Sequence, residues 1–144
     1  MGDHPHIATI RKYYDGCNRA DIDLMMSTFT PDVVHYFIDE PPVRGARALA
    51  DKWAGFSKDE SVPRWTVDHG IVQGDEAVIE WTLIWTRPHR QTVTVMTRGA
   101  EWYFFKEGKI REIRAYEALG PGDRPNELDG FPYAQKGYPM LSSG

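Results

Sequence analysis

Residues 101–117 read Glu-Trp-Tyr-Phe-Phe-Lys-Glu-Gly-Lys-Ile-Arg-Glu-Ile-Arg-Ala-Tyr-Glu, with alternating segments on either side of the pair Glu107-Gly108. Side chains alternate between the two faces of a β-strand, so this pattern around a short glycine turn predicts an antiparallel hairpin. We expect its strands to occupy residues 91–105 and 109–117. One face of the hairpin should point into the protein and the other toward its surface.

The preceding segments continue the same alternation. Residues 65–72 and 77–85 are separated by the turn Gln73-Gly74-Asp75, and residues 33–38 form a shorter stretch of the same kind. Together with the hairpin, the two longer segments predict four successive antiparallel strands.

Three segments near the N-terminus have helical periodicity instead. Apolar side chains recur at three- and four-residue spacing over residues 7–17, a second cluster follows Asp21 and stops before Pro31, and residues 46–56 are rich in helix formers. Helices that precede a strand meander predict an α+β fold, with three N-terminal helices covering one face of a curved antiparallel sheet. A pocket is expected between the two layers.

The last segment, residues 118–144, is rich in glycine and proline and predicts an irregular tail. Its apolar side chains at Leu128, Phe131, Tyr133 and Tyr138 indicate that the tail packs against the domain or against a partner subunit. The sequence contains no internal repeat and no linker, so residues 1–144 are expected to form a single domain.

Composition argues against several classes of protein. Of the 144 residues 41% are hydrophobic and 26% are charged, as in an ordinary globular chain, and no apolar run is long enough to cross a bilayer. The formal net charge is −4 and the basic residues are dispersed, which disfavours a nucleic-acid partner. The N-terminus has no secretory signal. We therefore expect a cytoplasmic protein without nucleic-acid or membrane partners.

The motifs that bind common cofactors are also missing. The sequence has no glycine loop that could cradle phosphate, no dinucleotide fingerprint and no serine-centred elbow. The single Cys17 cannot form an internal disulfide or an all-cysteine metal site, and His4 and His6 lie in an expected frayed terminus. The expectation is chemistry without a cofactor or a metal.

Five short segments carry a resemblance to a known family. They are Asn18-Arg19-Ala20-Asp21, Phe29-Thr30-Pro31-Asp32-Val33-Val34, Val43-Arg44-Gly45, Gly74-Asp75-Glu76-Ala77-Val78 and Phe105-Lys106-Glu107-Gly108-Lys109-Ile110. In this order of elements they resemble the SnoaL-like branch of the nuclear-transport-factor-two-like (ketosteroid-isomerase-like) superfamily. The resemblance covers residues 7–117 and implies a single SnoaL-like domain, shaped as a cone-like barrel with an internal pocket. That superfamily includes isomerases, dehydratases, cyclases and proteins without catalytic activity, so its fold alone does not define the function.

His35 is the first candidate for a catalytic role. It shares a strand face with Val33 and Phe37, and the resemblance turns this face toward the pocket. The catalytic aspartate of ketosteroid isomerase would fall at Phe37, so the base of that enzyme is missing here. A histidine titrates near neutrality and can act as a general acid or base. The alternative is a buried histidine whose ring is satisfied by a neighbouring hydrogen bond.

Tyr13 and Glu101 are the other two catalytic candidates, by comparison with the oxyanion-binding tyrosine and protonated aspartic acid of the isomerase. A carboxylic acid that stays neutral in an apolar wall can donate a hydrogen bond, and two converging donors form an oxyanion hole. Alternatively, Tyr13 is a core aromatic residue, and Glu101 forms an ion pair with Arg98 or Arg114.

The resemblance further implies a largely aromatic pocket wall. Its expected lining residues are Phe37, Trp53, Phe56, Trp81, Leu83, Trp85, Tyr103, Ile113 and Ala115. Glu117 is expected at the mouth. His69 resembles the histidine of scytalone dehydratase on the corresponding strand, which implies a place in the pocket. The alternative is a surface histidine beside Asp68. Aromatic walls favour a flat, partly apolar ligand.

These observations predict a cofactor-independent enzyme that transfers protons on a small, partly apolar or aromatic molecule, as a lyase, cyclase or isomerase. The alternative is a non-catalytic module of the same fold that binds a small ligand or mediates dimerisation. Trp102, Phe104 and Tyr116 share the outward face of the sheet, which is more apolar surface than a monomer usually exposes. We therefore expect a homodimer.

Overall fold

The computed structural model describes residues 3–58, 62–87, 90–117, 127–128, 130–139 and 141. Its helices are α1 (Pro5–Arg19), α2 (Ile22–Ser27) and α3 (Ala46–Lys58). Its strands are β1 (Phe29–Tyr36), β2 (Val43–Arg44), β3 (Arg64–Gln73), β4 (Glu76–Arg87), β5 (Arg90–Lys106) and β6 (Lys109–Glu117). The predicted α+β class and the predicted order of helices and strands are confirmed.

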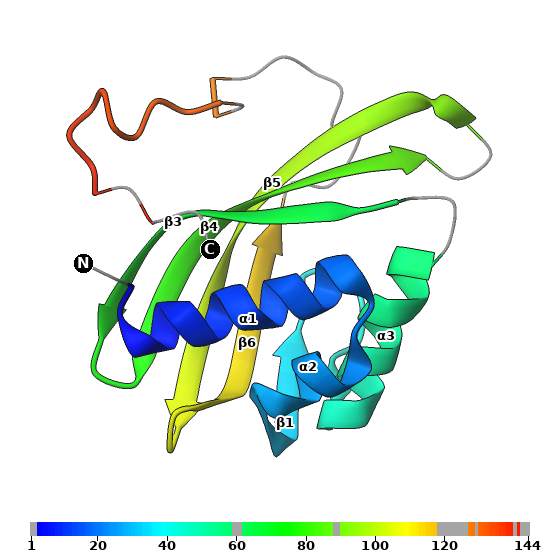
Figure 1. Cartoon of the computed structure of the whole chain (residues 1–144), viewed down its shortest axis with the longest axis vertical. Coiled ribbons are helices and arrows are strands. Elements are labelled where there is room, and N and C mark those ends of the chain that lie inside the picture. The colour runs from blue at the N-terminus through cyan, green and yellow to red at the C-terminus, as the bar shows by residue number, and fades with distance from the viewer. Residues whose placement is uncertain are drawn as a thin grey trace.

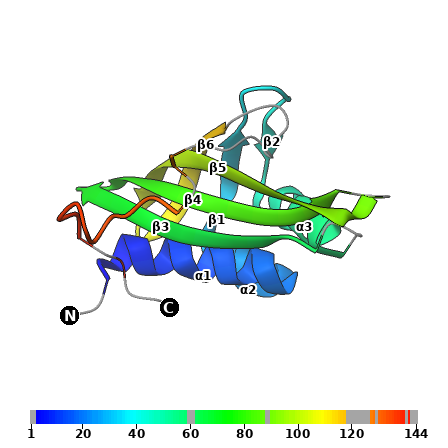
Figure 2. The same ribbon diagram turned by 90° about the horizontal axis from the view of Figure 1, so that it is seen from above.

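The six strands form one curved sheet in the order β2-β1-β6-β5-β4-β3 (Figure 1). Strands β3 to β6 are antiparallel neighbours, as expected from their short connections. Strand β1 lies parallel to β6 and antiparallel to β2, so the sheet is mixed. The sheet does not close on itself, and the helices lie along its concave side (Figure 2). Sheet and helices together form the cone that the fold class implies.

Helix α1 covers the sheet with one apolar stripe. Proline at the first helical position is compatible with the free N–H groups of a helix start, and Ile7, Ile10 and Cys17 are buried along the inner face. The helix ends at Ala20, which adopts a left-handed conformation with φ of 52°. The Asp21 side chain then accepts a hydrogen bond from the backbone N–H of Leu24 at 3.0 Å and begins α2.

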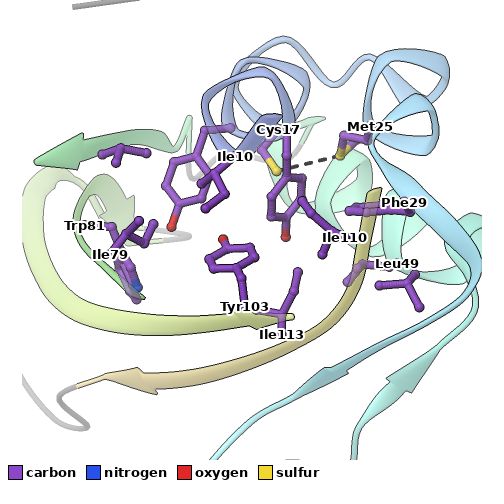
Figure 3. Close-up of a cluster of buried hydrophobic side chains, with 14 of the residues drawn as sticks. Ile10, Cys17, Met25, Phe29, Leu49, Ile79, Trp81, Tyr103, Ile110 and Ile113 are labelled. Carbon is purple, nitrogen blue, oxygen red and sulfur yellow. Dashed lines mark hydrogen bonds between the residues drawn. The ribbon is translucent and has the colours of Figure 1, made fainter. Parts of the chain in front are cut away.

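The narrow end of the cone is a filled hydrophobic core. Figure 3 shows Tyr103 and Ile113 of the sheet facing Ile10 and Cys17 of the helix layer, with Leu49 of α3 at the side. All five side chains are buried. Because this end is filled, space for a ligand can exist only toward the wide end of the cone.

The C-terminal segment contacts the outer side of the sheet where it is described. Tyr133 is buried, and Arg98 of β5 donates hydrogen bonds to its hydroxyl at 2.7 Å and to the carbonyl of Leu128 at 2.5 Å. Residues 118–126, 129, 140 and 142–144 of the expected tail lie outside the described residues. Within the described part of the chain, no helix is long and apolar enough to span a bilayer.

Candidate functional site

A cavity of about 320 Å³ opens at the wide end of the cone, between the sheet and the helices. The predicted residues that line it are Tyr13, His35, Phe37, Trp53, Phe56, Trp81, Leu83, Trp85, Glu101, Ala115 and Glu117. Six further lining residues were not predicted: Tyr14, Cys17, Glu40, Lys52, Trp65 and Thr97. Aromatic side chains make up most of the wall, and the few polar groups among them determine what the cavity can bind.

Glu101 lies in the wall of this cavity and is only 6% exposed. The hydroxyl groups of Tyr14 and Tyr103 both donate hydrogen bonds to its Oε1 atom, and the bond from Tyr103 measures 2.7 Å. The arginine partners considered from the sequence lie elsewhere. Arg98 pairs with Asp68 and Arg114 pairs with Glu112. The carboxyl group is therefore satisfied by phenol donors, and neither Arg98 nor Arg114 pairs with it.

His35 reaches the same carboxyl group from another strand. The ring is fully buried, and its Nε2 atom lies 3.3 Å from Oε2 of Glu101, a distance typical of an ion pair. The two atoms are not aligned as a regular hydrogen bond, and neither ring nitrogen has a hydrogen-bond partner among the described residues. The ring stacks on Phe37 at 4.2 Å and meets the edge of Trp53 at 5.6 Å.

Strand β6 brings these two residues together. Ile113 of β6 pairs with His35 of β1 on one side and with Tyr103 of β5 on the other, and Glu101 pairs with Ala115. Since every second residue of a strand shares a face, His35 and Glu101 both point to the concave side. The imidazole and the carboxylate are thus held by backbone pairing across three strands.

Glu101 accepts both of these hydrogen bonds on a single oxygen atom. Two hydroxyl groups that donate to one oxygen stabilise negative charge on the carboxylate. Burial raises the pKa of Tyr14 and Tyr103 well above the ordinary value of 10.0, and the nearby charge of Glu101 adds to the effect. Both phenols consequently stay protonated at neutral pH. The expected role of Glu101 as a neutral acid that donates to an oxyanion stays a prediction.

Tyr13 also borders the cavity and is buried. Burial raises its pKa well above 10.0, so it keeps its proton at neutral pH. The bond to Glu101, however, comes from Tyr14, the next residue on α1. Sequence analysis missed Tyr14, although both tyrosines belong to the apolar stripe of this helix. Tyr13 follows Ile10 by three residues and Tyr14 follows it by four, and both spacings place a side chain on the same face of a helix. Periodicity alone therefore does not distinguish the two tyrosines.

Two expected lining residues do not border the cavity. Tyr103 and Ile113 have the predicted inward orientation, but they lie one step nearer the narrow end, where the core is filled (Figure 3). Only the hydroxyl of Tyr103 reaches the polar group, through Glu101. Their prediction as wall residues is wrong because the cone narrows at this level.

The prediction that His69 lines the pocket is also wrong. A register shift interrupts the pairing of β3 with β4 between Val67 and His69. After the shift His69 pairs with Glu80, whereas Val67 pairs with Trp81, so the two β3 residues face opposite sides. His69 stacks on Tyr133 of the C-terminal segment at 5.2 Å, outside the cavity.

Charged side chains gather on the wall in a second group. Lys52 lies 3.1 Å from Glu40, and its ammonium group is 5.0 Å from the centre of the Phe37 ring. Glu117 is partly buried, and this burial is the main cause that raises its pKa; the negative charge of the nearby Asp39 adds a smaller effect. This group can interact with a polar substituent of a ligand.

Metal ligands are not concentrated anywhere in the described part of the chain. No group of three or more histidine, cysteine, aspartate or glutamate side chains there is placed to hold a metal ion. The cavity contributes one imidazole, one thiol and three carboxyl groups, and its histidine and Glu101 contact each other. Such an arrangement supports proton transfer between side chain and ligand.

Comparisons with known proteins agree with this architecture. A family model described as the SnoaL-like domain matches residues 10–113. A solved structure from Methylobium petroleophilum, described as a protein of unknown function with a cystatin-like fold, is 34% identical with a TM-score of 0.70. The alignment covers 96% of this chain and 93% of that chain. The comparison with curated proteins gives no match.

More distant structures share the fold. A putative SnoaL-like polyketide cyclase from Jannaschia sp. is 18% identical with a TM-score of 0.69, over 84% of this chain and 94% of that chain. A protein from Mycobacterium tuberculosis, solved in complex with estradiol-17beta-hemisuccinate, is 16% identical with a TM-score of 0.68, over 81% and 96% of the two chains. The family match spans more than half of the sequence, and the chain therefore belongs to the SnoaL-like domain family.

Proposed function

We propose that the cavity is a cofactor-independent active site in which His35 transfers a proton on a small, partly apolar or aromatic molecule. The observation that carries this proposal is the 3.3 Å approach of His35 Nε2 to Glu101 Oε2 within the wall of an aromatic cavity. An imidazole paired with a carboxylate is a stronger base and a better-oriented one than an isolated imidazole.

In this site Glu101 orients the His35 ring, and the ring exchanges a proton with the ligand. With its Nε2 atom 3.3 Å from the carboxyl group of Glu101, His35 uses the lone pair of Nδ1 to accept a proton from a carbon next to a carbonyl group. The C–H electron pair moves toward the carbonyl and forms an enolate, while the proton stays on the ring. The imidazolium then returns a proton to another atom of the same molecule, which completes an isomerisation, an elimination or a ring closure.

The wall chemistry supports the proposed ligand class. The aromatic side chains favour a flat molecule, and an apolar cavity strengthens every charge interaction inside it. The Mycobacterium tuberculosis protein of the same fold was solved with a steroid ester, which is a flat, largely apolar molecule. Tyr13, a protonated phenol on the wall, is the proposed donor to the oxygen on which charge develops.

Proton exchange on a model ketone tests this function without knowledge of the natural substrate. 2-Tetralone is aromatic, small enough for the cavity, and exchanges a benzylic proton next to its carbonyl for deuterium in deuterium oxide. We expect the protein to accelerate this exchange and the His35→Asn variant to lose about 100-fold or more of the acceleration. Glu101→Gln should lose most of it as well.

The controls separate catalysis from folding. The His35→Asn variant should keep a melting temperature close to that of the native protein, and Tyr138→Phe, in the exposed C-terminal segment, should exchange at the native rate. Undiminished exchange in folded His35→Asn would place the chemistry elsewhere. Exchange no faster than in buffer at any pH would favour the alternative, a module that binds a small ligand without turnover.

We further propose that the protein forms a homodimer through the outer face of the sheet. Trp102 is 39% exposed and Tyr116 is 49% exposed on neighbouring strands β5 and β6, which leaves an aromatic surface in water. Sedimentation at micromolar concentration should give the mass of two chains. A single-chain mass would contradict the proposal, and Trp102→Lys should convert a dimer into monomers.

A further inference from the structure

Two tryptophans of the cavity have indole N–H groups without a hydrogen-bond partner. Trp102 and Trp85 use theirs within the protein: the first donates to Glu76 at 2.5 Å and the second to Thr97 at 3.3 Å. The Nε1 atoms of Trp53 and Trp81 are buried, and among the described residues neither has an acceptor. Buried donors are nearly always paired in folded proteins, so an unpaired one requires an explanation.

Both unpaired groups belong to residues that line the cavity, one on a helix and one on a strand. Trp53 comes from α3 and Trp81 from β4, and both side chains line the space beside Glu101. Trp53 also lies beside Tyr13. Burial raises the pKa of Tyr13, and the neighbouring Trp53 lowers this pKa by a smaller amount. The indole N–H does not, however, reach the phenol oxygen in hydrogen-bond geometry.

The orientation of Trp81 is fixed by the strand next to it. Gly99 of β5 pairs directly with Trp81, and a methyl group at position 99 would lie 2.5 Å from the indole Cζ2 and 2.8 Å from Cε2. Those atoms form the edge of the ring beside Nε1. The missing side chain of Gly99 thus provides the space in which this edge of the indole rests.

We propose that Trp81 and Trp53 are donors to oxygen atoms of the bound ligand. The ligand is therefore a flat, largely apolar molecule that presents carbonyl or oxyanion oxygens, with no hydrogen-bond donor, to these two positions. An indole N–H is a donor only, so it selects acceptors. This inference rests on the proposed function because both place the ligand in the same cavity, and it deepens that function by identifying ligand-binding residues outside the His35–Glu101 pair.

If the acceptor oxygen is the one that gains charge during proton transfer, the indole groups also stabilise the enolate. Donors that are oriented before the reaction and shielded from water stabilise such charge more than water does. The packing of Trp81 on Gly99 provides that orientation.

Nitrogen-15 NMR of the indole groups gives a direct test. The full-length protein is titrated with 2-tetralone, which carries one carbonyl acceptor, and with tetralin, a hydrocarbon of nearly the same shape. The variants Trp81→Phe and Trp53→Phe assign the two signals and keep an aromatic ring at each position. We expect 2-tetralone, but not tetralin, to move at least one of these indole protons downfield while the Trp102 signal stays unchanged.

Affinity provides the second readout. Trp81→Phe or Trp53→Phe should weaken 2-tetralone binding by about 2- to 10-fold, as expected for one lost hydrogen bond, and leave tetralin binding unchanged. Equal weakening for both probes would mean that the indoles only pack against the ligand, and would overturn the inference. Failure of 2-tetralone to bind at millimolar concentration would overturn it too.

The two proposals fail separately. An indole response to 2-tetralone without His35-dependent exchange would contradict only the proposed catalysis. His35-dependent exchange without an acceptor-specific indole response would contradict only the role of Trp53 and Trp81. If one tryptophan variant does not fold, the other can still be titrated with both probes. Trp53 is half-buried and Trp81 is buried, so the two substitutions disturb the core to different degrees.

Discussion

Removing the two phenol donors of Glu101 one at a time and together tests the ionised state of this carboxyl group. Tyr14→Phe and Tyr103→Phe each delete one hydroxyl and keep the ring that packs in the core. Tyr14 is 7% exposed and Tyr103 is fully buried, so bulk water cannot readily replace either donor. Both lost bonds end on the same oxygen, Oε1.

The magnitude follows from the charge of the acceptor. A hydrogen bond to a charged group contributes about 1.5–3 kcal/mol to the free energy of unfolding, against about 1 kcal/mol for a neutral pair. We expect each single variant to lose about 2 kcal/mol, which lowers the melting temperature of a chain of this length by about 6 °C. The double variant leaves Oε1 without either donor and should lose more than the sum, with a coupling of about 1 kcal/mol.

Urea unfolding followed by circular dichroism measures all four corners of this cycle. Tyr138→Phe serves as the matched control, because Tyr138 is exposed in the C-terminal segment and the change should stay within about 0.5 kcal/mol. Losses near 1 kcal/mol for each variant that simply add would indicate a neutral carboxylic acid. That result would refute the carboxylate acceptor and restore the role of Glu101 as a donor to an oxyanion.

Three further predictions concern other parts of the site. Gly99→Ala should cost about 1–3 kcal/mol of stability and displace the indole of Trp81, which is measurable by urea unfolding and by the indole NMR signal. Glu117→Gln should stabilise the protein at neutral pH, because burial raises the pKa of Glu117 in the folded state. The Glu117 side chain therefore contributes most to stability below pH 4.5, its ordinary pKa, and this contribution is lost as the pH rises through the folded-state pKa. Asn18→Ala should cost about 1–3 kcal/mol, because its side chain bonds both the N–H and the carbonyl of Trp65 at 2.8 and 2.9 Å, joining α1 to β3.

The Glu117 and Gly99 predictions have matched controls. The melting temperatures of Glu117→Gln and of the native protein should converge in acid, and Glu107→Gln, on an exposed turn, should follow the native curve at every pH. A constant offset for Glu117→Gln at all pH values would contradict the assigned cause. A methyl group at Gly55 of α3 would meet open space, so Gly55→Ala should be neutral or stabilising. A loss of stability equal to that of Gly99→Ala would show that the loss at position 99 does not come from contact with Trp81.

Local patterns were sufficient for the elements and for most of the wall. The helical stripe over residues 7–17 and the alternation over residues 101–117 are properties of neighbours in the chain, and both elements form where they were expected. Alternation grouped His35 with Val33 and Phe37 on one strand face, since the side chains of a strand have a strict period of two. The resemblance to the family then directed this face and Glu101 toward the pocket, and both residues line the cavity.

Contacts between distant segments could not be derived in this way. The parallel pairing of β1 with β6 brings together the first and the last strand of the chain. The outward direction of the His69 side chain depends on one register shift beside Asp68. Neither leaves a periodic signal in the sequence. Register errors of one residue exchange the two faces of a strand, so such details are decided by pairing and not by composition.

The sequence alone determined the α+β class and the order of the helices and strands, because periodicity and side-chain alternation are local, and its resemblance to the family added the expectation that His35 and Glu101 face an aromatic interior. Only the tertiary structure decided that Tyr14 and Tyr103 donate to Glu101, that His35 approaches its second oxygen, and that the cavity ends before Ile113. The physical reason is that each hydrogen bond requires a donor and an acceptor from separate segments to lie within about 3 Å of each other, and this depends on the packing of the whole domain.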